Sequence, residues 1–157
     1  MIELDATPGA TQIEMYGSFA DARSMMLLTA IQQLQDAGVD PAIWAIEPPS
    51  DDVFTAAIAA QTRLDDRSSK LLLVVAGELG SGQVGSDMRD SEKRVIRVAA
   101  RTHGVTGVLI GPGAYYRHLV QFHEGIIERE KAVDVIADHL VDVREIFENS
   151  RTASEVL

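Results

Sequence analysis

Three short apolar segments, each about the length of a single β-strand, alternate with helical patterns along the chain. They are Ile43–Glu47, Leu71–Ala76 and Val105–Ile110. The second is apolar at every position, which is typical of strands buried on both faces of a parallel sheet. Because strands that alternate with helices form right-handed parallel crossovers, we predict an α/β fold built from parallel βα repeats.

Helices are expected between and after these strands because apolar residues recur there at helical spacing. Ser18 is a suitable N-cap for the first helix, and Gly38 follows its end. A further short strand is expected at Thr11–Tyr16. The expected helices span Ala20–Ala37, Asp51–Arg63, Asp90–His103, Tyr115–Glu124 and Glu130–Asn149.

The expected strands are fewer than the eight that close a TIM barrel, which typically takes about 250 residues. With 157 residues, the chain suits a single domain, expected over residues 1–150, with a frayed tail over residues 151–157. Two architectures remain open: half of a TIM barrel, or a small open three-layer sheet. Either would leave strand edges unpaired, so we expect a homodimer that covers them.

Composition excludes several classes of function. The net charge of −10 opposes binding to nucleic acid or to an anionic membrane, because both require clustered cations. No apolar run approaches the roughly 20 residues of a membrane span, and we expect a cytoplasmic protein. The chain has no cysteine, and His118 and His123 are five residues apart rather than the four of a zinc pair on a helix. We therefore expect no metal site and no cofactor.

Several motifs occur in the order found in one family of barrels. They are Ala30-Ile31 through Leu34, Asp36-Ala37-Gly38-Val39-Asp40-Pro41, Ile43-Trp44-Ala45-Ile46-Glu47, Gly104-Val105-Thr106-Gly107-Val108-Leu109-Ile110-Gly111, and Glu124-Gly125 followed by Glu130-Lys131-Ala132-Val133. Residues from about Leu27 to Asn149 thereby resemble the C-terminal half of a class I aldolase-like TIM barrel. The resemblance is to the tagatose-bisphosphate aldolase-like domain that is fused to sugar kinases of bacterial inositol catabolism. It implies that the three apolar segments correspond to barrel strands six, seven and eight.

Two residues depart from the family pattern. Ala45 stands where the relatives have the lysine that forms the Schiff base, and Pro112 stands where they have an arginine. A Schiff-base aldolase needs a desolvated amine with a lowered pKa. Of the three lysines, Lys70 precedes its strand, and Lys93 and Lys131 lie on expected outer helices. The sequence therefore argues against class I aldolase activity and leaves open whether the protein is an enzyme.

The loops that follow the second and third apolar segments are the candidate ligand site. In barrels, such loops bind phosphate through backbone N–H groups, and glycine allows the backbone to approach an oxyanion closely. A small anionic or sugar-phosphate ligand is thus expected here, although the glycines could equally serve only as turns. The candidate ligand-binding residues are Gly80, Ser81, Gly82, Gly111, Gly113 and Tyr115.

Two glutamates are the candidate catalytic residues. Glu47 ends its strand and Glu78 lies in the following glycine-rich loop, so the pair could act as acid and base in a lyase or isomerase of phosphosugar-type substrates. Glu47 could equally form a structural ion pair with an arginine. Three hypotheses follow: a degenerate half-barrel that binds a small ligand or has a structural or regulatory role, an acid–base enzyme, and a subunit whose barrel is completed by another chain.

Overall fold

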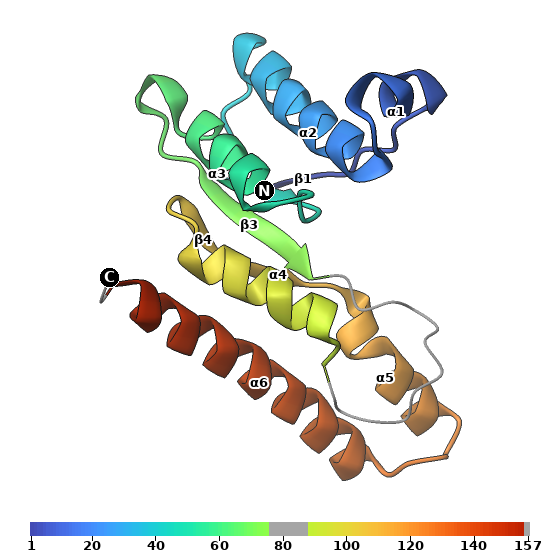
Figure 1. Cartoon of the computed structure of the whole chain (residues 1–157). Helices are drawn as coiled ribbons and strands as arrows, with labels where there is room; N and C mark the ends of the chain where they lie inside the picture. Colours follow the sequence, from blue (N-terminus) through green and yellow to red (C-terminus); the bar gives the residue numbers. More distant parts are fainter. Residues whose placement is uncertain (76–87, 156–157) are drawn as a thin grey trace.

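The computed structural model describes residues 1–75 and 88–155 of the chain (Figure 1). The described residues form one sheet of four parallel strands, whose spatial order follows the sequence. The predicted α/β fold of parallel βα repeats is therefore confirmed. The strands are β1 (Ile2–Leu4), β2 (Ile43–Ile46), β3 (Lys70–Val75) and β4 (Val105–Ile110).

The described part of the chain has six α-helices besides this sheet, and all five of the predicted helices are among them. Two short 3₁₀ turns, η1 (Leu64–Asp66) and η2 (Pro112–Ala114), precede β3 and α5. The helices are α1 (Ala10–Tyr16), α2 (Phe19–Asp36), α3 (Asp52–Gln61), α4 (Asp90–Arg101), α5 (Tyr116–His123) and α6 (Arg129–Glu155).

The N-terminal region differs from the prediction. Thr11–Tyr16 was expected as a strand but belongs to α1, which ends at Gly17 in the left-handed conformation, with its N–H donating to the Ile13 carbonyl. The first strand is β1 instead, where Ile2 and Leu4 pack against the core and Glu3 between them is exposed. This period-two alternation is itself a strand signal. The local apolar pattern at Ile13 and Met15 could not reveal that α1 packs on α2.

The C-terminal region also differs from the prediction. The tail over residues 151–157 was expected to be frayed, but α6 continues as a helix to Glu155. Ser150, the residue just before this tail, is buried, so the helix still contacts the rest of the protein there.

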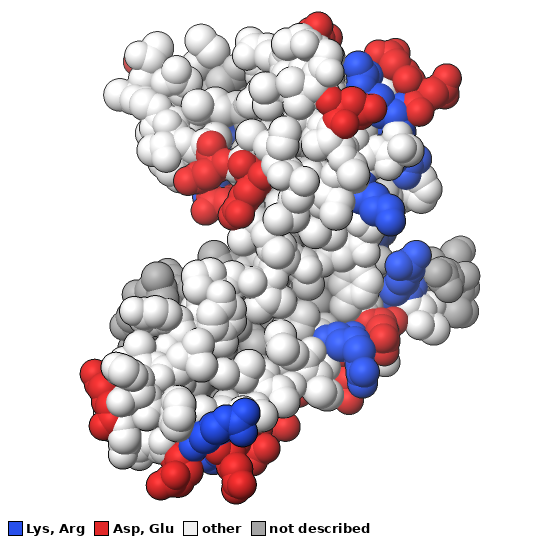
Figure 2. Space-filling model, turned by 180° about the vertical axis from the view of Figure 1, so that it is seen from behind, with Lys and Arg blue, Asp and Glu red and all other residues white. Residues whose placement is uncertain are grey.

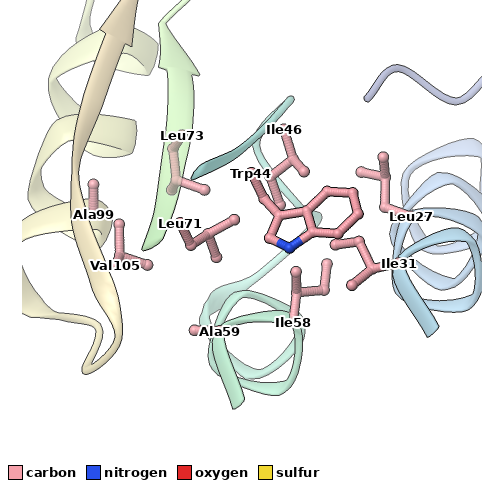
Figure 3. Packing of buried hydrophobic residues seen from close by; sticks show 10 residues of the cluster. All are labelled: Leu27, Ile31, Trp44, Ile46, Ile58, Ala59, Leu71, Leu73, Ala99 and Val105. Carbon is pink, nitrogen blue, oxygen red and sulfur yellow. The ribbon is translucent and has the colours of Figure 1, made fainter. Parts of the chain in front are cut away.

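The main core lies between one face of the sheet and helices α2, α3 and α4 (Figure 3). Trp44 is its largest fully buried side chain, with Leu27 and Ile31 of α2 on one side and Ile58 of α3 below it. The remaining members are Ile46, Ala59, Leu71, Leu73, Ala99 and Val105. A smaller cluster joins β3, α4 and α6 through Val75, Met88, Ile96 and Val143.

The opposite face of the sheet carries small and aliphatic residues. The strand register aligns Glu3, Ala45, Leu72 and Gly107 in one row across all four strands. None of these belongs to the two core clusters, whose members from α2, α3, α4 and α6 meet the other face. The helices thus cover one face of the sheet, as they do on the outside of a barrel. The described residues are compatible with both predicted architectures, the half-barrel and the small open sheet.

A β-bulge interrupts the pairing of the last two strands. Leu71 lies opposite Val105 and Leu72 lies opposite Gly107, so Thr106 is the extra residue. The Thr106 hydroxyl donates to the Leu71 carbonyl at 3.2 Å. Beyond the bulge, Val108 packs on the helix side.

Replacing Trp44 should reveal how far stability depends on this core. We expect Trp44→Ala to lower the free energy of unfolding by about 3–5 kcal/mol, because it removes a large buried ring. Trp44→Phe should cost less, since the indole Nε1 is buried without a hydrogen-bond partner among the described residues and its removal relieves that penalty. Denaturant unfolding measures both. Val53→Ala, at a side chain that is 76% exposed, is the control and should change stability by less than about 0.5 kcal/mol.

Candidate functional site: a cleft at the carboxyl ends of β2 and β3

A cleft of about 270 Å³ lies where β2 and β3 end, between the first turns of α2 and α4. Parallel α/β proteins bind ligands at this edge of the sheet. Its floor is apolar, formed by Val74, Val75 and Val95, while charged side chains line its walls. The polar lining residues are Arg23, Glu47, Arg89, Ser91 and Glu92.

Arg23 and Glu47 form one wall. The guanidinium of Arg23 donates from Nη1 to Glu47 Oε2 and from Nη2 to the Pro48 carbonyl, the latter at 3.0 Å. The Phe19 ring lies 5.9 Å from the guanidinium carbon, within the range of a cation–π contact. Arg23 Nε is buried and has no hydrogen-bond partner among the described residues. Of the two roles predicted for Glu47, the structure shows the ion pair with an arginine.

The sequence around Ser18 fixes the start of α2 and so positions Arg23. Ser18 is the N-cap, as predicted, and its hydroxyl oxygen accepts from the Asp21 N–H at 3.0 Å. Hydrogen bonds from Ser18 and then from Ser50 stabilise the carboxylate and lower the pKa of Asp21. Ser24 accepts from the Ser50 N–H at 2.8 Å. This bond ties α2 to the loop after β2, which holds Arg23 beside Glu47.

The first turn of α4 forms the other wall. Glu92 accepts from the Arg89 backbone N–H at 2.9 Å and from Arg89 Nη2, also at 2.9 Å. Glu92 therefore caps the helix start and orients the guanidinium. The cleft consequently contains two guanidinium groups and two carboxylates. Such a lining can donate hydrogen bonds to an anion and accept them from hydroxyl groups.

The predicted site residues are only partly brought together. Glu47 lines the cleft, whereas Gly111, Gly113 and Tyr115 are not among its described lining residues. The Gly111 N–H donates to the Val75 carbonyl at 3.0 Å, so this amide is already engaged and does not face an oxyanion. Gly113 lies within η2, and Tyr115 follows it with 39% of its surface exposed.

Four further predictions concern residues outside the described part of the chain. Glu78, Gly80, Ser81 and Gly82 lie between residues 76 and 87, which the structure does not describe. Their expected roles in catalysis and ligand binding stay predictions.

Sequence reasoning missed Arg23, Arg89, Ser91 and Glu92. The spacing of Arg89 and Glu92 at a helix start gave a usable signal, because an acidic residue at the third helical position typically caps the backbone. No comparable signal identified Arg23, which is 24 residues from Glu47 in the sequence.

The structure places Ala45 and Lys70 on the same face of the sheet. Ala45 is fully buried and lies opposite Leu72 on the sheet face away from Trp44. Lys70 was expected to precede its strand but is the first residue of β3, paired with Ile43. It therefore shares the face of Ala45, at the amino end of the strand. Because Lys70 is exposed, it lacks the desolvated surroundings that activate an amine.

Two kinds of feature are absent from residues 1–75 and 88–155. No group of three or more histidines and carboxylates there could hold a metal ion. Among the helices of the same residues, none is sufficiently long and apolar to cross a membrane.

Comparisons with known proteins give no match to a family model, to a curated protein or to a solved structure. The cleft is therefore interpreted from its own geometry.

A double-mutant cycle should measure the link between α2 and the end of β2. We expect Arg23→Met and Glu47→Gln each to lower the free energy of unfolding by about 0.5–1.5 kcal/mol, because each leaves a partly buried partner unpaired. The double variant should lose less than the sum of the two. Chemical denaturation provides all three values.

A second ion pair of the same chain serves as the control. Arg144 and Glu148 are 4.0 Å apart on α6, and both side chains are about two-thirds exposed. The corresponding cycle with Arg144→Met and Glu148→Gln should show a coupling of less than about 0.5 kcal/mol. Strict additivity at Arg23 and Glu47 would contradict a structural role for their pair.

Proposed function

We propose that this chain is a degenerate aldolase-like half-barrel without a Schiff-base lysine. It binds a small anionic ligand of the sugar-phosphate class in the cleft and acts as a homodimer. The ligand proposal depends on the hydrogen bonds of the Arg23 guanidinium. Glu47 and the Pro48 carbonyl hold its guanidinium in place, while Nε has no partner among the described residues. A guanidinium held in this way is preorganised for an anion.

The size and polarity of the cleft support a small ligand with hydroxyl groups. Its volume of about 270 Å³ lies just below the range of roughly 300–1,000 Å³ that is typical of drug-sized pockets. A phosphate would accept hydrogen bonds from Arg23, and hydroxyl groups would donate to Glu47 and Glu92. The apolar floor of Val74 and Val75 suits the carbon skeleton of a sugar.

Acid–base catalysis by Glu47 has less support than binding. Its carboxylate is already engaged by Arg23 in an ion pair, so it is not free to contact a substrate proton in this arrangement. The predicted partner Glu78 lies outside the described residues. If no ligand binds, we would infer a purely structural or regulatory role. If the protein is a monomer by itself, we would infer that a different chain completes the barrel.

Titration calorimetry should test the ligand proposal with dihydroxyacetone phosphate, glucose 6-phosphate, inorganic phosphate and unphosphorylated glucose. We expect at least one phosphorylated compound to bind and glucose not to bind. Arg23→Met should weaken binding by about 10- to 100-fold, the range for loss of a charged hydrogen bond. The matched control is Arg97→Met, at an exposed position of α4, which removes the same charge and should leave affinity unchanged. Equal loss in both variants, or no binding at all, would refute the proposal.

Borohydride treatment in the presence of dihydroxyacetone phosphate should test the absence of Schiff-base chemistry. We expect the intact mass of the protein to stay unchanged, because Ala45 supplies no amine and Lys70 is exposed. The control is Ala45→Lys, which places an amine at the buried position. A covalent adduct on Lys70, Lys93 or Lys131 of the unchanged protein, located by peptide mapping, would overturn this part of the proposal.

A further inference from the structure

Both outer strands of the sheet have an edge without a strand partner among the described residues. β1 pairs only with β2, and β4 pairs only with β3. Such edges expose backbone N–H and C=O groups that readily pair with another strand. Because all four strands are parallel, the two edge strands β1 and β4 run in the same direction.

The face of the sheet opposite the helix layer has the character of a barrel interior. Its row of residues includes Ala45 and Leu72, and the same face continues with Val74 and Leu109 toward the carboxyl edge. Ala45 and Val74 are buried within one copy, whereas Glu3, at the β1 end of the row, is exposed. Seen from behind, the middle of the molecule is a band without charged side chains, and the charged groups gather at its margins (Figure 2). Such a largely apolar face suits contact with a second copy of the chain.

Most of the exposed large apolar side chains belong to two groups, one near the N-terminal end of the sequence and one near the C-terminal end. Among the described residues, only Val53 and Leu64 of this kind come between β2 and β3 in the sequence. One group belongs to β1, α1 and α2, and the other to the region from η2 to α6 (Figure 1). The first group is Met1, Met15, Tyr16 and Phe19; the second is Tyr115, Tyr116, Leu119, Phe122, Ile126, Val133, Leu140 and Val141.

We propose that two copies of this chain close one eight-stranded parallel barrel, in which β4 of each copy pairs with β1 of the other. A two-fold axis along the barrel relates the copies, so both junctions are equivalent and no edge remains. Each α6 then packs between its own α4 and the partner's α1 and α2, which brings the two apolar groups together. The inference rests on the homodimer of the proposed function and specifies which strands meet.

Light scattering and sedimentation should test the apolar junction. We expect a mass of twice the 17.0 kDa of one chain. Leu140→Lys, at a side chain 47% exposed in one copy, should weaken the dimer at least tenfold, because it places a charge in the junction. Val53→Lys, at the 76% exposed position on α3, is the matched control and should leave the dimer intact. Equal effects of the two variants would contradict the proposed junction.

Disulfide trapping should then identify the strands that meet. The chain contains no cysteine, so each cross-link reports only the introduced pair. One tagged copy carries a cysteine on or after β1, and the other carries one on or after β4. The variants are Glu3→Cys, Asp5→Cys or Thr7→Cys in the first copy and Gly107→Cys, Leu109→Cys or Gly111→Cys in the second.

The pattern of cross-links separates the alternatives. We expect a covalent dimer only when a β1 variant is mixed with a β4 variant. Within such mixtures, the cross-link should form for the cysteine pair whose Cα atoms come within about 7 Å. Glu3→Cys alone should not cross-link, because the two β1 strands lie on opposite sides of the closed barrel. Cross-linking of Glu3→Cys with itself would indicate that the β1 edges meet antiparallel and would overturn the inference. A dimer without any mixed cross-link would overturn it too, while leaving the homodimer and the ligand site intact.

Discussion

The burial of Trp44 against α2 and α3 is the constraint on which the rest of the structure depends. Because successive strand residues point to opposite faces, placing this ring on the helix side sends Ala45 to the other face. Ile46 returns to the core, and the strand then ends with Glu47 beside the first turn of α2. The cleft and the face of the sheet opposite the helices thus both depend on the position of one large side chain.

Much of the fold could be predicted from the sequence because its signals are local. The apolar runs of β2, β3 and β4, the Ser18 cap and the helical spacing of the five longer helices each lie within a few neighbouring residues. The failures at β1 and α1 have a different cause. Ile13 and Met15 alternate like a strand, yet α1 packs on α2, and only the tertiary arrangement shows that β1 pairs with β2.

The site was harder to predict because its parts come from distant segments. Glu47 was recognised at the end of a strand, where parallel sheets carry their functional residues. Its partner Arg23 lies in the preceding helix, and the position of Arg23 depends on the Ser24–Ser50 bond that joins this helix to the loop after β2. The glycines after β4 had the composition of an anion site, but composition cannot show that the Gly111 amide is already bonded to Val75.

The balance of charge in the cleft bears on how a ligand would be selected. The chain carries a net charge of −10, but each guanidinium in the cleft is accompanied by a carboxylate. Long-range attraction therefore contributes little, and selection depends on matching the directions of hydrogen bonds. Such short-range interactions are screened by salt less than attraction between distant surface charges.

The bulge at Thr106 marks the one point of the β3–β4 pairing at which β4 carries a residue without an opposite partner. Val105 lies opposite Leu71 and Gly107 lies opposite Leu72, so Thr106 can be lost without moving the later side chains of β4 to the other face. Loss of one residue beyond Gly107 would instead exchange the faces of all the side chains that follow it. Single-residue deletions in β4 are therefore expected to be tolerated at the bulge and not beyond it, so the bulge is where the length of this strand can change during divergence.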